Sequence, residues 1–280
     1  MRFQTKYLAA GCIAFSALIL TACEKDETKN DSDTGVATEY YKGQRESDDI
    51  FAALNAAAQD NSVMRPDEDF DVTSTLLPEC ATVTVDTVGS TKSIMIDFGT
   101  TGCLCDDWDG KTRKGKITAQ WSGKYRQPGT VIQVSTQDYY VNGNKHEFNK
   151  TVKNDGLNDE SHLSYTVNIT LAKITYADGT VTQWTSSRTR EWSEGEATLT
   201  PYDDVYHITG SASGTSAAGE DFSVNITSPL EVALSCNWVR EGTMVITPQG
   251  KPARTLDFGN GNCDNNATVE INGTVYNINL

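Results

Sequence analysis

The sequence predicts an all-β protein, with an antiparallel sheet arranged as a sandwich or an extended meander and one short amphipathic helix near the N-terminus. From Cys80 onward, apolar and polar residues alternate with a period of two, which is typical of half-buried strands. Turn-forming residues recur at short intervals, and no spacing fits a strand–helix–strand unit. We therefore expect roughly ten to fourteen strands.

The predicted helix covers residues 47–59. Ser47 is a suitable N-cap, Asp48 and Asp49 supply acidic residues to the first turn, and apolar residues follow at helical spacing through Ala58. This pattern predicts about three to four turns with one apolar face. The helix lies in a lead segment, residues 46–76, that precedes a β-rich domain, residues 77–280.

The first 22 residues predict a secretory signal peptide. Arg2 and Lys6 form a short positive region, and an apolar run follows up to Leu20. This run is too short and wrongly flanked to span a membrane. The four residues that end at Cys23, LTAC, resemble the bacterial lipobox, and the resemblance implies that Cys23 carries a diacylglyceryl lipid and begins the mature chain. The alternative is an ordinary signal in which a cysteine falls at the cut by chance.

Residues 23–45 are predicted to form an acidic, solvated tether. Residues 24–33 are polar and mostly acidic, and no apolar residue occurs before Val36. Such a segment cannot bury enough apolar surface to offset its ordering entropy. The acidic residues also resemble the surface-export signal of Bacteroidetes lipoproteins, although a generic linker has a similar composition. We expect a lipid-anchored protein of the outer membrane, on its periplasmic or its cell-surface side.

The charge of the chain disfavours nucleic acid as a partner. The formal net charge is −15, and removal of the signal peptide with Arg2 and Lys6 takes it to −17. An acidic protein repels nucleic acid and anionic lipid headgroups. The expected partners are the membrane, through the lipid anchor, and an envelope protein or a glycan.

Asn272-Gly273 is the strongest hairpin signal in the chain. A two-residue loop there sorts apolar and polar residues onto opposite faces, with Val275 as the one exception. The predicted register pairs Ile271 with Thr274, Val269 with Tyr276, and Ala267 with Ile278. Asn142-Gly143 and Asp178-Gly179 predict further hairpins, and a slip in the apolar phase predicts a β-bulge near Ala172 and Lys173.

The phrase D-F-G-x-x-x-C occurs twice, as IDFGTTGC ending at Cys103 and as LDFGNGNC ending at Cys263. Cys80 precedes the first of these cysteines by 23 residues, and Cys236 precedes the second by 27. In an exported protein, this spacing predicts two related disulfide units, residues 77–125 and 234–280. The chain-entropy relation gives each disulfide about 3 kcal/mol of stabilisation.

Cys105 is the odd cysteine of the β-rich domain. Cys80 pairs with either Cys103 or Cys105, and the other of these two remains a free thiol. Zinc sites commonly combine cysteines with histidines. The three histidines stand apart in the sequence, at His146, His162 and His207. We therefore expect neither a metal site nor a cofactor.

Several motifs together resemble a family of secreted Bacteroidetes lipoproteins of unknown function. They are LPEC, IDFGTTGC, a YYVNG hairpin, SSRTREW, DDVYHITGSASG and LDFGNGNCDNNATVEING. The resemblance covers nearly all of the mature chain from Leu77 onward, and the repeated D-F-G-x-x-x-C is its most specific feature. It implies a secreted, β-rich lipoprotein and transfers no catalytic residue.

A ladder of aromatic and basic side chains is the first candidate binding site. If residues 184–192 form an unbroken strand, five side chains fall on one face: Trp184, Ser186, Arg188, Arg190 and Trp192. Guanidinium groups could then lie over indole rings. The face would be either a platform on which sugars stack or a self-contained ladder that stiffens the strand.

Two oxygen-rich turns are candidates for calcium binding. One contains Asp106, Asp107 and Asp109, and the other contains Asp257, Asn260, Asn262 and Asp264. Neither has the spacing of an EF-hand loop, and the same residue types are common in tight turns.

The chain has none of the hydrolase or zinc-protease motifs that combine a nucleophile or a metal with a base, so no catalytic residue is predicted. We expect a non-catalytic binding or structural component of the cell envelope, which works through an exposed sheet face or loops. The alternatives are a glycan-binding module that uses Trp184 and Trp192, and an envelope hydrolase with two converging carboxylates. Under the tether hypothesis, deletion of residues 24–45 would impair partner access and leave the melting temperature unchanged.

Overall fold

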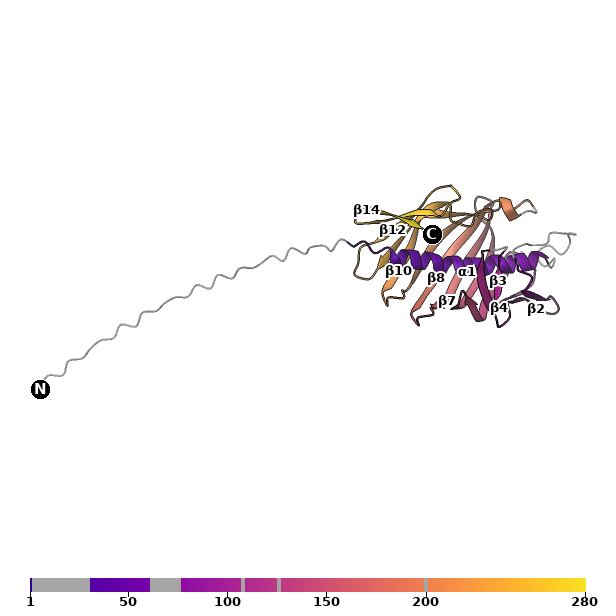
Figure 1. Ribbon diagram of the computed structural model, residues 1–280. Helices are drawn as coiled ribbons and strands as arrows, with labels where there is room; N and C mark the ends of the chain where they lie inside the picture. Colours follow the sequence, from indigo (N-terminus) through magenta and orange to yellow (C-terminus); the bar gives the residue numbers. More distant parts are fainter. Residues whose placement is uncertain (2–30, 61–76, 107–108, 125–126, 199–200) are drawn as a thin grey trace. The chain divides into compact units, whose positions relative to one another are not determined.

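One helix and fourteen strands form the part of the chain that the computed structural model describes (Figure 1). Apart from Met1, the described residues are 31–60, 77–106, 109–124, 127–198 and 201–280. The signal peptide, the lipidation of Cys23 and the first part of the predicted tether lie outside them. Asp31–Leu280 form one compact unit.

The strands form a single antiparallel sheet. Its path is β1-β2-β4-β5-β6-β7-β8-β9-β10-β11-β12-β13-β14, and β3 pairs with β4 beside this path. The strands are β1 (Thr82–Asp86), β2 (Thr91–Asp97), β3 (Cys103–Cys105), β4 (Lys111–Ser122), β5 (Val131–Val141), β6 (Asn144–Leu157), β7 (Leu163–Thr175), β8 (Val181–Glu194), β9 (Val205–Thr215), β10 (Asp221–Ala233), β11 (Glu241–Pro248), β12 (Arg254–Asn260), β13 (Asn266–Ile271) and β14 (Thr274–Asn279). A 3-10 turn, Pro201–Asp203, precedes β9.

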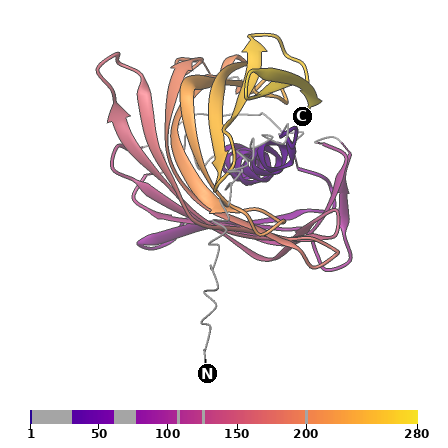
Figure 2. The same cartoon turned by 90° about the vertical axis from the view of Figure 1, so that its left-hand side faces the viewer.

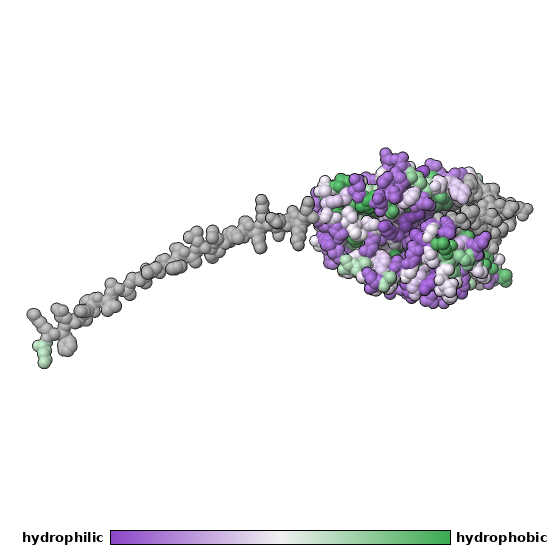
Figure 3. All heavy atoms as spheres, viewed as in Figure 1, coloured by the Kyte–Doolittle hydropathy of each residue, from purple (hydrophilic) through white to green (hydrophobic). Residues whose placement is uncertain are grey.

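The predicted all-β fold is confirmed, and of the two predicted arrangements the sheet has that of a meander. The sheet is strongly curved, and its concave face wraps around the single helix, α1 (Gly35–Asp60) (Figure 2). The helix lies along β2, β4 and β11. Figure 3 shows the side on which α1 faces the viewer in Figure 1, and hydrophilic residues cover much of it.

The helix begins twelve residues earlier than predicted, at Gly35 instead of Ser47. The prediction of a solvated tether up to residue 45 is therefore wrong for residues 35–45. Val36 and Tyr40 are buried in the core, and Ser47, the predicted N-cap, is itself buried within the helix. The carboxylate of Asp33 accepts a hydrogen bond from the backbone N–H of Gly35 at the observed start of α1.

The N-terminal half of α1 is as buried as its C-terminal half, because the sheet encloses it. The Tyr40 ring makes edge contacts with Trp184 of β8 and Phe222 of β10, at centroid distances of 6.0 and 5.6 Å. The Tyr41 ring lies 5.3 Å from that of Phe258 in β12. Deletion of residues 24–45 would thus remove core side chains, and we now expect it to lower stability.

The local predictions about hairpins are confirmed. The β13–β14 hairpin has the predicted register, including Val269 opposite Tyr276, and Asn272 and Gly273 both have positive φ, as the tight turn requires. Asn142-Gly143 forms the equivalent two-residue turn between β5 and β6. The Asp178-Gly179 turn joins β7 to β8 through a longer loop. The register between β7 and β8 shifts between Ile169 and Ala172, which places the predicted bulge there.

Candidate functional surfaces

The two predicted disulfides are present, and each encloses one hairpin. Cys80 pairs with Cys103 around β1 and β2, and Cys236 pairs with Cys263 around β11 and β12. Cys105 is a free thiol with no exposed surface, and burial raises its pKa. A buried thiol of raised pKa is a poor nucleophile, so we assign Cys105 no reactive role.

The repeated Asp-Phe-Gly triplet has the same local structure in both units. Phe98 and Phe258 are buried in the core. The carboxylate of Asp97 accepts a hydrogen bond from the backbone N–H of Gly99, and Asp257 does the same for Gly259. Both glycines have positive φ. Both triplets thus combine an anchored phenylalanine with a glycine of positive φ, but the first begins at the last residue of β2, whereas the second lies within β12.

The aromatic and basic ladder of β8 faces the helix and not the solvent. Trp184 and Trp192 are only 2% and 3% exposed, and Arg188 is 6% exposed. The Trp184 Nε1–H donates to Gln44 of α1 at 3.4 Å, and Arg188 donates to the Tyr40 hydroxyl at 2.7 Å. The prediction that these side chains share one face is correct. The interpretation of this face as a sugar-stacking platform is wrong, because stacking requires an exposed ring.

The guanidinium groups of the ladder lie against tyrosines rather than against the predicted indoles. Arg190 stacks 3.7 Å from the Tyr206 ring centroid, and the Arg188 guanidinium lies 5.9 Å from the Tyr40 ring centroid. These contacts connect β8 to β9 and to α1. The ladder thus contributes to the packing of the helix within the sheet.

Small uncharged polar side chains cover the convex side of the same strands. We define the polar face as the residues that line a shallow hollow of about 560 Å³ there, apart from three buried ones (Ser186, Ala212 and Val224): Thr185, Ser187, Ser211, Ser213, Ser223, Asn225, Val245 and Thr247. They are cross-strand neighbours on β8 to β11; for example, Ser211 pairs with both Ser187 and Asn225. All except Val245 are exposed. A chain with 61 charged side chains thus has an uncharged hydrogen-bonding surface at the centre of its sheet.

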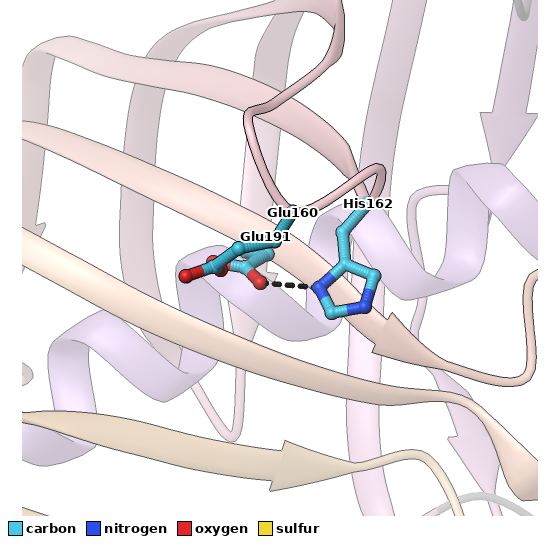
Figure 4. Close-up of side chains that lie close together, drawn as sticks. All are labelled: Glu160, His162 and Glu191. Atoms are coloured by element: carbon cyan, nitrogen blue, oxygen red, sulfur yellow. Dashed lines mark hydrogen bonds and ion pairs between the residues drawn. The ribbon is translucent and has the colours of Figure 1, made fainter.

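Three ligand-type side chains converge at one end of β8 (Figure 4). We define Glu160, His162 and Glu191 as the rim cluster, and their ligand atoms all lie within 4.8 Å of one another. The His162 Nδ1 is 2.6 Å from the Glu191 Oε1. The hydrogen bond from His162, together with the nearby imidazoles of His162 and His207, lowers the pKa of Glu191. The cluster therefore presents two carboxylates beside an imidazole, and the pKa of one of these carboxylates, that of Glu191, is lowered.

The turn that carries Glu160 and His162 is fixed by the side chain of Asn158. Its Oδ1 accepts hydrogen bonds from the backbone N–H groups of Glu160 and His162, at 3.0 and 2.9 Å. The Asn158 backbone N–H in turn donates to the carbonyl of His162. Ser161 has a φ of 65°, which is uncommon for a residue other than glycine. Both ligand-type side chains are thus aimed by local backbone bonds.

Carboxylates of α1 itself are held in ion pairs. Asp48 pairs with the buried Lys150 at 3.1 Å, and Asp49 pairs with Arg45 at 3.3 Å. Burial raises the pKa of Asp49 to about 6 despite Arg45, and the neighbouring Glu46 adds to the rise. Lys111 bridges Glu46 and Asp49 from β4. Each of these acids has a cation beside it, which is the arrangement of a structural ion-pair network.

His146 is a buried imidazole on the concave side of β6. It is 4% exposed and lies between the rings of Tyr139 and Phe148, with centroids at 6.2 and 5.8 Å. Burial, with smaller contributions from the cations of Lys111 and Arg113, lowers its pKa to about 4. His146 is therefore neutral at pH 7.

The oxygen-rich turns use their carboxylates internally. Asp109 accepts both guanidinium N–H groups of the buried Arg113, at 2.6 and 2.7 Å, and pairs with Lys111. Asp107 lies outside the described residues. In the second turn, Asp257 and Asp264 cap backbone N–H groups two residues ahead. These bonds account for Asp109, Asp257 and Asp264 as turn and ion-pair residues.

No family model, curated protein or solved structure matches this chain significantly. Within the described residues, no helix combines the length and the apolar character needed to cross a membrane. The fold and its surfaces define an all-β, disulfide-bonded protein whose curved sheet encloses a helix and presents an uncharged polar face outward.

Sequence reasoning missed the rim cluster because its members are separated by a whole hairpin. Glu160 and His162 precede β7, whereas Glu191 lies near the end of β8 and opposite Ser164. The available signal was the Asp178-Gly179 turn, because folding the chain back there brings residue 191 close to residue 162. The polar face was also detectable, as serine and threonine at alternate positions of four consecutive strands.

Proposed function

We propose that this protein is an outer-membrane lipoprotein, anchored through Cys23, that acts without catalysis as a binding component of the cell envelope. Its signal peptide and lipobox-like LTAC support export and anchoring. The two disulfides support an oxidising compartment. The polar face is its binding surface, and the ligand is an uncharged, hydroxyl-rich glycan chain.

The uncharged character of the polar face is the observation that carries this proposal. Its exposed groups are hydroxyls and one amide, which can donate and accept hydrogen bonds with sugar hydroxyls. Serine is depleted in protein–protein interfaces, so this composition favours a glycan over a protein partner.

Binding at such a surface is weak for a single copy. Each neutral hydrogen bond contributes only about 0.5–1.5 kcal/mol net, and the polar face lacks the aromatic ring that usually strengthens sugar binding. Lipid anchoring offsets this, because many copies on one membrane engage one polymer at high effective concentration. A polymeric glycan of the envelope is therefore the appropriate ligand for an anchored array.

A glycan array probed with multivalent protein tests the binding surface. The chain with Cys23→Ser is displayed as a streptavidin tetramer, and binding is compared with that of Ser211→Lys, which places a long charged side chain in the polar face. Gln133→Lys is the matched control, because Gln133 is exposed on β5, away from the polar face. Loss of binding in the first variant alone is expected. A blank array, or equal binding by both variants, would contradict the assignment.

Anchoring has a separate test. The wild-type chain should incorporate a radiolabelled fatty acid and fractionate with the outer membrane, whereas Cys23→Ser should do neither. Retention of the unlabelled variant in the outer membrane would refute the lipid anchor.

A further inference from the structure

The rim cluster has the ligand types and the convergence of a metal site. It combines one imidazole and two carboxylates, and their ligand atoms all lie within 4.8 Å of one another. A tetrahedral zinc ion with bonds of about 2.0–2.2 Å needs its ligand atoms roughly 3.3–3.6 Å apart. The Glu160 side chain must therefore move inward, and the His162 Nδ1 and Glu191 Oε1 atoms, now 2.6 Å apart, must separate by somewhat less than about 1 Å, for the three groups to reach one ion. Figure 4 shows the imidazole of His162 facing the carboxylates, with a hydrogen bond to Glu191 already formed.

The backbone on both sides of the rim cluster is fixed, which lowers the ordering cost of binding. Glu191 belongs to an interior strand, where it pairs with Ser164 of β7 and His207 of β9. His162 and Glu160 are positioned by the Asn158-centred turn. Ligands on rigid elements retain more of the interaction free energy of a bound ion than ligands on loose loops do.

We propose that Glu160, His162 and Glu191 bind one divalent transition-metal ion, with Zn²⁺ as the fitting ion, through His162 Nδ1 and one oxygen of each carboxylate. On binding, the ion takes the place of any proton on His162 Nδ1 and the imidazole keeps one N–H, at Nε2: the Nδ1 proton of a neutral ring passes to Nε2 by way of solvent, and that of an imidazolium is released to solvent. The imidazole favours zinc over the hard cations Mg²⁺ and Ca²⁺, which prefer ligand sets made only of oxygen. Three protein ligands leave a fourth position open to water.

The bound ion would clamp the β6–β7 turn to β8. At present, a single side-chain pair, His162 with Glu191, connects the two within the rim cluster. Coordination joins Glu160 to the same point and closes the end of the sheet beside the polar face. The rim cluster is therefore assigned a structural role that is independent of glycan binding.

His207 provides a matched control within the same cross-strand row. It pairs with Glu231 at 3.6 Å and is 40% exposed at its side chain, against 38% for His162. Glu231 is already bound by Arg240 through two hydrogen bonds to one oxygen. The His207–Glu231 pair thus has a similar composition and exposure, but a cation already occupies its carboxylate.

Calorimetric titration with ZnCl₂ tests the assignment on the full chain carrying Cys23→Ser, without an affinity tag. One Zn²⁺ per chain is expected for this protein and for His207→Gln, with the melting temperature raised by zinc in both. His162→Gln and Glu191→Gln should weaken zinc binding at least about tenfold and abolish the thermal shift. Even the loss of a residue that only hydrogen-bonds to a metal ligand lowers metal affinity by about this factor. Circular dichroism of the metal-free variants establishes that they are folded.

Four results would overturn the proposal. The first is the absence of stoichiometric zinc binding by the Cys23→Ser chain. The second is unchanged affinity in folded His162→Gln, and the third is an equal loss of affinity in His207→Gln. Binding of CaCl₂ as tight as that of ZnCl₂ would likewise contradict a site in which the imidazole is a ligand.

Discussion

Replacement of Gly43 by alanine tests whether α1 is enclosed by the sheet. At an exposed helix position, this change stabilises a protein by about 1 kcal/mol because glycine is a poor helix former. Gly43 instead faces β8, and a Cβ placed on it would lie 2.7 Å from Trp184 Cη2 and 3.0 Å from Cζ3. Contacts this short require one of the two groups to move.

The Trp184 indole has little room to move. It is 2% exposed, and its ring makes edge contacts with Tyr40 and Phe148 at centroid distances of 6.0 and 5.9 Å. Overpacking of a core in this way costs about 1–3 kcal/mol. With the helix-propensity gain of about 1 kcal/mol, we expect Gly43→Ala to destabilise the wild-type protein by about 0–2 kcal/mol.

A double-mutant cycle with Trp184→Phe isolates the clash, because phenylalanine lacks the outer ring atoms that meet the new methyl group. In the Trp184→Phe protein, Gly43→Ala should become stabilising by about 1 kcal/mol, which gives a coupling of about 1–3 kcal/mol. Urea unfolding at pH 7 measures all four proteins, and Lys42→Ala at an exposed helix position serves as the control. Equal stabilisation of both backgrounds by Gly43→Ala would refute the packing of α1 against Trp184.

Three further predictions concern protonation and the disulfides. His146 has a folded-state pKa of about 4, which is below its unfolded value of about 6.5. Its contribution to stability is therefore present above about pH 6.5 and is lost as the pH falls toward 4. In urea titrations, His146→Phe should reduce the loss of unfolding free energy between pH 7 and pH 5 by about 2 kcal/mol. Asp49 has a folded-state pKa of about 6, which is above its unfolded value of 3.8. Its contribution to stability is therefore present below pH 3.8 and is lost as the pH rises through 6. Between pH 4 and pH 8, the unfolding free energy of Asp49→Asn should rise by about 1–3 kcal/mol relative to that of the wild type, and a pH-independent difference would count against the raised pKa. The variant with both Cys236 and Cys263 replaced by serine should lose about 3 kcal/mol in the same assay, and peptide mapping of the unreduced wild type should recover both disulfides within their own units.

Features that depend on neighbouring residues were predictable from the sequence. The Asn272-Gly273 turn fixes the β13–β14 register because a two-residue loop leaves no choice of partners. The disulfide units follow from cysteine spacing around a repeated phrase, although the choice of Cys103 over Cys105 depends on the β3–β4 pairing.

Features that depend on enclosure by the sheet were not predictable. In the sequence, residues 35–46 mix Tyr40 and Tyr41 with several charged residues, and their helical periodicity looks weaker than that of residues 47–59. Burial of this segment becomes evident only when strands as distant as β8 and β12 meet it. The same enclosure turns Trp184 from an apparent binding residue into a core residue, because alternation along a strand reports a shared face but not which face is covered.

The repeated disulfide unit has a physical explanation in the open sheet. The meander path has two edge strands, β1 and β14, while β3 pairs only with β4 beside the path; edge hairpins have neighbours on one side only. One unit encloses β1 and β2 at one edge, and the other encloses β11 and β12 near the opposite edge. Each unit also anchors a buried phenylalanine in the core, Phe98 or Phe258. The first disulfide therefore stabilises an edge hairpin, whereas the second joins the ends of a hairpin that has a neighbouring strand on each side.

The two faces of the central strands then have separate tasks. On β8, Trp184 and Arg188 bind the helix from the concave side, while Thr185 and Ser187 face solvent on the convex side. Because side chains alternate strictly between the faces, residues of the polar face can change without altering the contacts with α1. Because α1 occupies the concave side, the convex side is the surface of the central strands that a partner can reach. This separation explains why we assign binding to small polar residues and stability to the aromatic ones.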